Sequence, residues 1–194
     1  MQGSDRVIGA MKVTTSVAPR TGVLPGVIIP KLVHGSSIAT VVTGNESLDG
    51  YDAIITENRT LTIGIKTADC APVCFADGTR IGIAHVGWRG LCLGLSEKMF
   101  DRFDTEHLSV FVGPFLHAFE IRKDFCYDQI TGVFGERFID QKGGTYVFRF
   151  KDALASVLPD ETVYDERDTG ADASLPSHRR GSVEERLVTM VAFA

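Results

Sequence analysis

Short apolar runs, separated by clusters of glycine, aspartate and asparagine, dominate the first half of the chain. Runs of roughly four to eight residues that are rich in β-branched side chains and bounded by turn-forming residues are typical of β-strands. We therefore predict strands over 37–43, 51–56, 61–66, 72–76 and 80–84. Their close spacing predicts a sheet, whereas residues 1–25 carry only weak strand signals.

The spacing of apolar residues changes after residue 90. Large apolar side chains then follow one another at every fourth position: Leu91, Leu95, Met99 and Phe103. Because residues four apart lie on the same face of a helix, this spacing indicates a single amphipathic helix over 91–103. We expect its apolar face to cover the sheet.

The second half of the chain alternates between strands and helices less regularly. We predict strands over 108–112, 118–122, 162–165 and 186–193, and helices over 124–134 and 150–158. The second helix ends before Pro159, because proline cannot continue a helix. Residues 167–182 lack apolar periodicity and read as one long loop, a length that is uncommon unless the loop has a function. The pattern as a whole indicates a mixed α/β fold.

Composition and charge narrow the class of protein. The chain has 194 residues, 44% of them hydrophobic, and no linker or repeat divides it, so we expect a single domain over 1–194. A net charge of −5 argues against nucleic acid binding through a basic surface. The sequence shows neither an apolar run of roughly 18 residues nor signal-peptide features, so we expect a cytoplasmic protein with no membrane partner.

Four cysteines are present, and no two of them form a C-x-x-C pair: Cys70, Cys74, Cys92 and Cys126. A chain of this length does not need disulfides to hold its core together, so we interpret all four as reduced thiols. The ordinary role of such a cysteine is that of a small buried hydrophobic residue, although one or two could have a chemical role.

Two segments interrupt apolar strands with reactive side chains: 66–74, which contains Cys70, and 84–90, which contains His85. Both fall at predicted strand ends, where side chains of an α/β protein converge on a cleft. A thiolate and two imidazoles suit Zn²⁺ and leave a fourth position for water, and His34 is the natural third ligand. The spacing matches no short zinc motif, so a buried cysteine with two structural histidines and a nucleophilic Cys70–His85 pair stay open.

Basic residues near these segments suggest an anion site. The turn 87–90 opens the predicted helix, so its backbone N–H groups and the Arg89 guanidinium would face the cleft and suit a phosphate. Ser177, Arg179 and Arg180 form a second basic cluster in the long loop. Adjacent arginines in a loop are otherwise ordinary solvated residues.

Other polar and aromatic residues have less specific patterns. Trp88 could fill the core or stack on a base. Asp69 could orient a ligand histidine through a hydrogen bond, or form a turn. We interpret His107 and His117 as structural residues.

Five short elements together carry a resemblance to a known family: Val33-His34-Gly35, Thr67-Ala-Asp-Cys70-Ala-Pro-Val, Ala84-His85-Val-Gly-Trp-Arg-Gly90, Gly113-Pro114 and Ser177-His-Arg-Arg180. In their order and separations they resemble the YfiH-like family. This family has been called multicopper polyphenol oxidase or laccase-like, and is now also described as a purine nucleoside phosphorylase family. The pairing of Asp-Cys-x-Pro-Val with His-x-Gly-Trp-Arg-Gly is the specific part of the match.

The resemblance has consequences for fold and metal. It implies a layered α/β sandwich (α/β/β/α) in which a mixed β-sheet core is flanked by helices. It also implies a zinc site formed by His34, Cys70 and His85, with copper as the other possible metal. These are the three residues that the chemistry of the side chains had already suggested.

The resemblance also implies an activity. Similar proteins are reported to split adenosine, inosine and methylthioadenosine with phosphate into base and sugar 1-phosphate, and to deaminate adenosine. We therefore expect a metal-dependent purine nucleoside enzyme with Cys70, His85 and Arg89 as catalytic residues. The residues expected to hold substrate and phosphate are Arg89, Ser177, Arg179 and Arg180. The expected partners are small molecules alone, and the expected state is a monomer or homodimer.

Two other function classes compete with this expectation. A hydrolase using Cys70 and His85, for instance an amidase that corrects peptidoglycan precursors, would survive chelation, whereas a zinc enzyme would not. A protein that merely binds a metal would need a fourth protein ligand, for which His117 and Cys74 are the candidates. A multicopper phenol oxidase is disfavoured because five histidines are too few for several histidine-rich copper sites.

Overall fold

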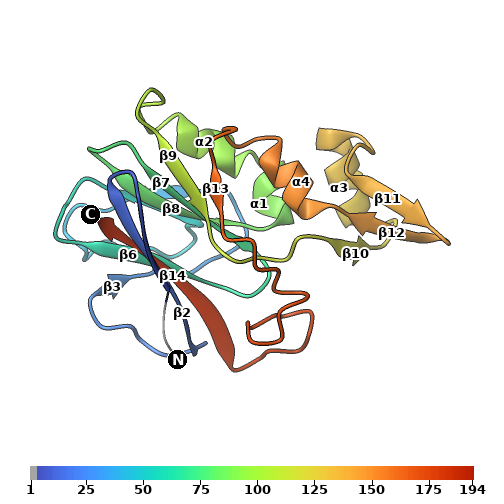
Figure 1. Cartoon of the computed structure of the whole chain (residues 1–194), viewed down its shortest axis with the longest axis horizontal. Helices are drawn as coiled ribbons and strands as arrows, with labels where there is room; N and C mark the ends of the chain where they lie inside the picture. Colours follow the sequence, from blue (N-terminus) through green and yellow to red (C-terminus); the bar gives the residue numbers. More distant parts are fainter. Residues whose placement is uncertain (1–3) are drawn as a thin grey trace.

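Two β-sheets packed face to face form the centre of the protein, as seen in a computed structural model that describes residues 4–194 (Figure 1). The first sheet has five strands, which follow one another in the order β1 (Ser4–Ile8), β2 (Met11–Pro19), β14 (Glu185–Phe193), β6 (Thr62–Thr67) and β3 (Val27–Ile28). All of its neighbours are antiparallel except β3 and β6. The last strand of the chain therefore lies in the middle of the sheet, between segments from its first third.

The second sheet has six strands and carries the residues of greatest chemical interest. Their order is β13 (Val163–Tyr164), β9 (Ser109–Val112), β7 (Ala71–Ala76), β8 (Ile81–Val86), β5 (Ala53–Thr56) and β4 (Ile38–Thr40). The central pairs β7–β8, β7–β9 and β5–β8 are antiparallel, whereas both edge strands pair in parallel. Strands β7 and β8 are buried along their whole length, because they are covered on both faces.

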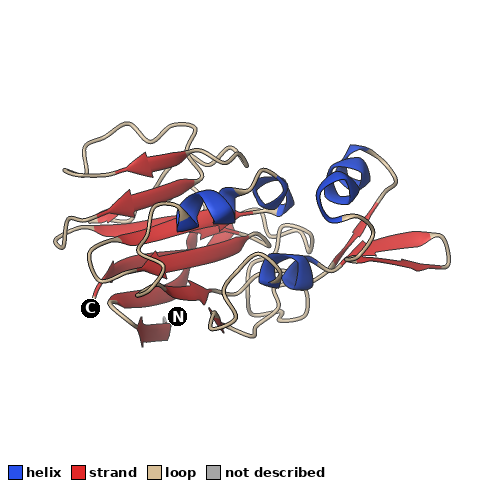
Figure 2. Cartoon of the chain, turned by 90° about the horizontal axis from the view of Figure 1, so that it is seen from above, coloured by secondary structure: helices blue, strands red, loops and turns tan. Residues whose placement is uncertain are grey.

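Of the four helices within residues 4–194, α1 (Trp88–Cys92) and α2 (Leu95–Phe100) cover the six-stranded sheet, whereas α3 (Phe125–Phe134) and α4 (Phe150–Ala155) lie towards one end of the molecule (Figures 1 and 2). Next to α3 and α4, a three-stranded antiparallel sheet projects at one end of the molecule, with the order β10 (Phe119–Ile121), β12 (Thr145–Phe148) and β11 (Ile139–Lys142). None of the helices in the described part of the chain is long and apolar enough to cross a membrane.

Two apolar layers hold this arrangement together. Between the sheets lie fully buried side chains from both, among them Met11, Ile63, Ile83 and Phe111. Between the six-stranded sheet and the helices lies a second layer rich in aromatic rings, such as Phe75, Phe115, Phe148 and Phe150. The mixed α/β class with a layered sheet core and flanking helices is therefore confirmed.

The single helix predicted over 91–103 is wrong in detail. The structure has two short helices, α1 and α2, separated at Gly94, whose φ of 71° is left-handed. Glycine adopts this conformation without the steric cost that a Cβ atom imposes, so it breaks the helix while the apolar face stays continuous. Leu91, Leu95 and Met99 are all buried against the sheet, as the spacing predicted.

A long β-hairpin is present in the N-terminal segment, although the strand signal of the sequence is weak there. Strands β1 and β2 pair in antiparallel register, and β2 buries Met11 and Val13 while Lys12 stays exposed. The outer face of β2 carries threonine and serine, so the sequence of this strand is only moderately apolar. Its buried and exposed residues nevertheless alternate as they do in a half-buried strand. Strands β11 and β12 were not predicted, because their residues are mostly exposed or half-buried.

Candidate functional site

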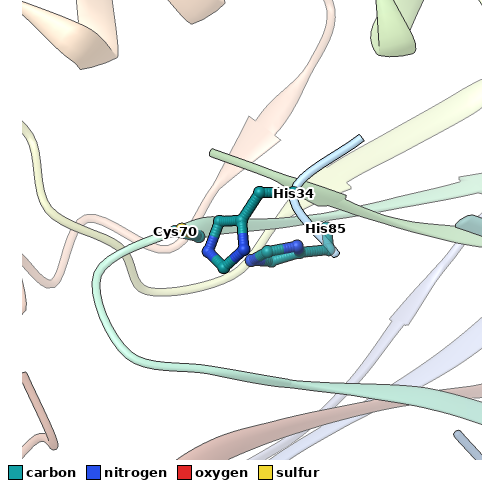
Figure 3. A group of neighbouring side chains, drawn as sticks. All are labelled: His34, Cys70 and His85. Carbon is teal, nitrogen blue, oxygen red and sulfur yellow. The ribbon is translucent and has the colours of Figure 1, made fainter. Parts of the chain in front are cut away.

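Three side chains converge at one end of the six-stranded sheet: His34, Cys70 and His85 (Figure 3). His34 comes from the loop before β4, Cys70 from the position directly before β7, and His85 from within β8. Their ligand atoms all lie within 4.8 Å of one another, and the two imidazole rings meet edge to face at 4.7 Å. The structure thus brings together the three residues that the sequence analysis selected.

Asp52 organises two of these residues and was missed by the sequence analysis. Its Oδ1 atom lies 2.9 Å from Nδ1 of His85, and the same carboxylate accepts the backbone N–H groups of His34 at 2.9 Å and Gly35 at 2.6 Å. Asp52 is fully buried and directly precedes β5, whose pairing with β8 sets it beside His85. Because Nδ1 is occupied, His85 presents Nε2 to the site.

The backbone around the three residues is held in unusual conformations. His34 has φ 60° and Asp69, next to Cys70, has φ 86°, a region that residues other than glycine rarely adopt. Such strain persists only when the surroundings fix it, and at His34 the hydrogen bonds to Asp52 do so. A Cβ atom on Gly87 would lie 3.0 Å from Sγ of Cys70, so the glycine of the His-x-Gly-Trp element keeps the site open.

Hydrogen bonds within the group shift the pKa values of Cys70 and His85. Burial alone would raise the pKa of Cys70, but hydrogen bonds with His34 and His85 lower it to about 7. Burial would lower the pKa of His85, but hydrogen bonds with Asp52 and Cys70 raise it to about 9. A thiolate is thus accessible near neutral pH, which suits both metal ligation and nucleophilic attack.

The three residues form one wall of a cavity of about 390 Å³, a size usual for small-molecule sites. Apolar and aromatic residues form another part of its lining: Leu32, Trp88, Leu116, Phe119 and Phe150. The basic side chains around it are Arg20, Lys66, His178, Arg179 and Arg186. The sequence left two roles open for Trp88, filling the core and stacking on a base. In the structure, Trp88 lines the cavity and is half-buried.

The long loop 167–182 closes over one side of the cavity because Asp69 holds it. Oδ1 of Asp69 accepts from the Thr169 hydroxyl at 2.8 Å, and Oδ2 accepts from the backbone N–H of Arg179 at 2.9 Å. The suggestion that Asp69 orients a ligand histidine is therefore wrong, since Asp52 takes that place. The available signal for Asp52 was weak: one acidic residue directly before a run of three apolar residues, 53–55.

The residues predicted to hold phosphate separate into two groups. Arg179 lines the cavity, with its guanidinium carbon 4.3 Å above the Phe119 ring. Arg89 is exposed, lies 5.2 Å from the Trp88 ring and does not line the cavity. Arg180 instead donates to carbonyl oxygens within its own loop, and the buried Ser177 accepts from the backbone N–H of Arg180. Ser177 and Arg180 therefore shape the loop rather than the cavity.

The remaining histidines and cysteines stay outside the group. His107 faces Asp104 at 3.0 Å on the surface, and His117 packs on Phe115. Within residues 4–194, neither His117 nor Cys74 joins the three converging side chains as a fourth ligand. All four cysteines are free, as predicted.

Comparison with known proteins relates this arrangement to a family. A family model described as multi-copper polyphenol oxidoreductase laccase matches residues 11–194. A purine nucleoside phosphorylase of Aquifex aeolicus is 28% identical over 151 residues, which cover 73% of this chain and 70% of the relative. The purine nucleoside phosphorylase YfiH of Escherichia coli is 33% identical over 95 residues, covering 46% of this chain and 39% of the relative. An adenosine deaminase from an unknown prokaryotic organism is 28% identical over 98 residues, covering 44% and 37%.

Solved structures show the same fold. A YfiH protein of Bacillus licheniformis superimposes with a TM-score of 0.77 at 19% identity, covering 96% of this chain and 97% of its own. A protein of Neisseria meningitidis reaches a TM-score of 0.79 at 19% identity, covering 95% and 94%. Because the family model spans nearly the whole chain and the fold agrees over the same length, the protein belongs to the YfiH-like, multi-copper polyphenol oxidoreductase laccase family.

Proposed function

We propose that this protein is a zinc-dependent purine nucleoside phosphorylase that also deaminates adenosine. The observation that carries the proposal is the convergence of His34, Cys70 and His85 on a cavity that also has aromatic walls and basic side chains. The names of the relatives, purine nucleoside phosphorylase and adenosine deaminase, support the same class of substrate. We also propose adenosine and inosine as substrates and the reducing cytoplasm as the setting, which suits four free thiols.

The donor set fits zinc. One thiolate and two imidazole nitrogens are the ligands that Zn²⁺ prefers, and three protein ligands leave a coordination position that faces the cavity. The Asp52–His85 hydrogen bond resembles the carboxylate–histidine pairs that orient metal ligands in general. When bound, zinc would supply Lewis acidity to the reacting purine nucleoside or water. Copper, which accepts the same ligand types, is the alternative metal.

The chain's own side chains have separable roles in this proposal. Trp88 and Phe119 offer ring faces and edges that can pack against a purine. Arg179 supplies positive charge for phosphate, a role that its place on the cavity wall supports better than the exposed position of Arg89. Asp52 keeps His85 in one tautomer and holds the His34 loop in place.

A second candidate is a thiol hydrolase, such as an amidase acting on peptidoglycan precursors. The specific observation in its favour is the sequence of contacts from Asp52 to His85 to Cys70, with the pKa of the thiol lowered to about 7. This is the arrangement of nucleophile, base and orienting group that covalent catalysis uses. Such an enzyme would act without a metal.

Incubation of the metal-loaded protein with adenosine and phosphate, with and without a chelator, tests the proposal. Adenine, inosine and ribose 1-phosphate are followed by chromatography. We expect chelator-sensitive product that Cys70→Ala lowers roughly 100-fold or more, because it removes a metal ligand. Cys126→Ala, which removes a thiol of α3, serves as the matched control.

Two outcomes of this experiment would each reject a different part of the proposal. Absence of all three products from the metal-loaded protein would reject the nucleoside proposal. Product formation that depends on Cys70 but survives chelation would reject the zinc role and favour the thiol hydrolase.

A further inference from the structure

Positive charge is concentrated around the cavity of a protein that is acidic as a whole. The chain carries a net charge of −5, yet its cavity is lined by four arginine and lysine side chains, Arg20, Lys66, Arg179 and Arg186, and by one carboxylate, Asp69. The oxygens of Asp69 are already engaged by Thr169 and by the backbone of Arg179. A cavity with this balance favours an anionic ligand.

Two of these arginines are neighbours at the end of the five-stranded sheet. Arg186 of β14 lies opposite Ala18 of β2, and the backbone N–H of Arg20 donates to the carbonyl of Glu184 at 2.7 Å. Arg20 directly follows β2, two residues after Ala18, so Arg20 and Arg186 are diagonal neighbours at this end of the sheet. Side chains in this relation can reach a common ligand.

Lys66 fixes the turn that carries Arg20. Its ammonium group donates to the backbone carbonyls of Pro19 at 3.0 Å, Arg20 at 3.2 Å and Gly22 at 2.5 Å. The charge of Lys66 is therefore used to hold the backbone, while the Arg20 guanidinium stays exposed beside the cavity. The NH1 group of Arg186 is held by the carbonyls of Ser182 and Glu185.

Neither guanidinium group forms an ion pair in the described chain, although the Asp69 carboxylate lies near enough to Arg186 to offset part of its charge. Within residues 4–194, the arginines that form ion pairs are Arg6, Arg80, Arg149 and Arg167, and none of these lines the cavity. Burial, and then the like charge of Arg20, lower the pKa of Arg186 below its ordinary value. An anion between the two groups would relieve that repulsion.

We propose that Arg20 and Arg186 form a subsite for a tetrahedral phosphoryl dianion at the end of the cavity built by the five-stranded sheet. Paired guanidinium groups match the oxygens of such a group through several parallel hydrogen bonds. The ligand is either free inorganic phosphate or the phosphoryl group of a nucleotide. With inorganic phosphate as the occupant, this inference rests on the proposed phosphorolysis and names the residues that bind its second substrate.

Titration calorimetry on the full-length, metal-loaded protein tests the subsite directly. Inorganic phosphate is titrated in one arm and adenosine 5′-monophosphate in the other, against wild type, Arg20→Gln and Arg186→Gln. We expect each variant to weaken binding of the occupant roughly tenfold or more, because a charge-assisted hydrogen bond is lost. Arg102→Gln, at an exposed arginine near α2 outside this cavity, should bind like wild type.

Arg20→Gln is the decisive variant, because among residues 4–194 its side chain makes no hydrogen bond that folding would require. A response to phosphate alone identifies the free ion as the occupant, and a response to the nucleotide alone identifies the phosphoryl group of a nucleotide. Unchanged affinity for both ligands in Arg20→Gln, or no binding of either to wild type, overturns the subsite.

Steady-state kinetics separates this inference from the proposed function. With free phosphate as the occupant, we expect Arg20→Gln to raise the KM for phosphate several-fold more than the KM for adenosine, whereas Arg102→Gln should leave both values near wild type. Phosphorolysis with an unchanged phosphate KM, in a variant whose affinity for adenosine 5′-monophosphate is also unchanged, would overturn the subsite and leave the proposed function standing. Phosphate binding that depends on Arg20, together with no product from any nucleoside, would support the subsite and reject the proposed function.

Discussion

Asp52 is the residue on which the geometry of the candidate metal site depends most. One buried carboxylate holds the ring of His85 through Nδ1 and the backbone of His34 and Gly35 through two N–H groups. The second set of bonds stabilises a left-handed backbone at His34, which a residue with a Cβ atom adopts at a cost. Both histidines are therefore held in position by a residue that does not itself line the cavity.

Replacing Asp52 by asparagine should weaken zinc binding about 10- to 100-fold, because an amide cannot accept hydrogen bonds at both of its side-chain atoms. Asp49→Asn, a surface aspartate three residues earlier, should bind zinc like wild type. Competition with a chelator of known affinity, read by metal content, measures the change. Zinc affinity of Asp52→Asn within threefold of wild type would show that the carboxylate does not position the ligands.

At the scale of elements, the site depends on breaks and turns as much as on regular strands. Leu93 and Leu95 flank Gly94, whose left-handed backbone separates α1 from α2. This break lets α1 begin next to the site at Trp88 while α2 packs on β8. The four-residue spacing of apolar residues survives the break and so conceals it from the sequence pattern.

Gly94→Ala should destabilise the protein by about 1–2 kcal/mol, because alanine pays a steric cost at positive φ. Gly132→Ala lies in the exposed interior of α3 with no atom near the added methyl group, and should stabilise by roughly 0.5–1 kcal/mol. Urea unfolding of both variants measures the change in the free energy of unfolding, which should be opposite in sign for the two. A Gly94→Ala variant as stable as wild type would mean that α1 and α2 can join as one helix.

At the scale of the whole molecule, every layer contributes to the cavity. The five-stranded sheet supplies Arg20 and Arg186, the six-stranded sheet supplies His85, and the end of the small sheet supplies Phe119. The loop 167–182, tied down by Asp69, supplies Arg179. A ligand that binds the three converging residues links segments that lie far apart in the sequence, so binding should stabilise the fold as a unit.

Zinc should therefore raise the melting temperature. At a free zinc concentration 100 times the dissociation constant, binding to the native state adds about 2.7 kcal/mol, which corresponds to roughly 5–10 °C for a chain of this size. Cys70→Ala should abolish the rise, and Cys126→Ala should keep it. Calorimetric scans with and without zinc measure the shift, and an equal rise in Cys70→Ala would place the stabilising metal elsewhere.

The sequence by itself determined the strand-rich α/β class, the apolar face over 91–103, the three reactive residues and the family. These features follow from local periodicity and from the chemistry of single side chains, both of which are visible in a linear chain. Only the tertiary structure decided that Asp52 rather than Asp69 contacts His85, and that Arg20 and Arg186 rather than Arg89 line the cavity. The reason is physical: strand register and loop closure set the direction of a side chain, and both depend on partners far away in the sequence.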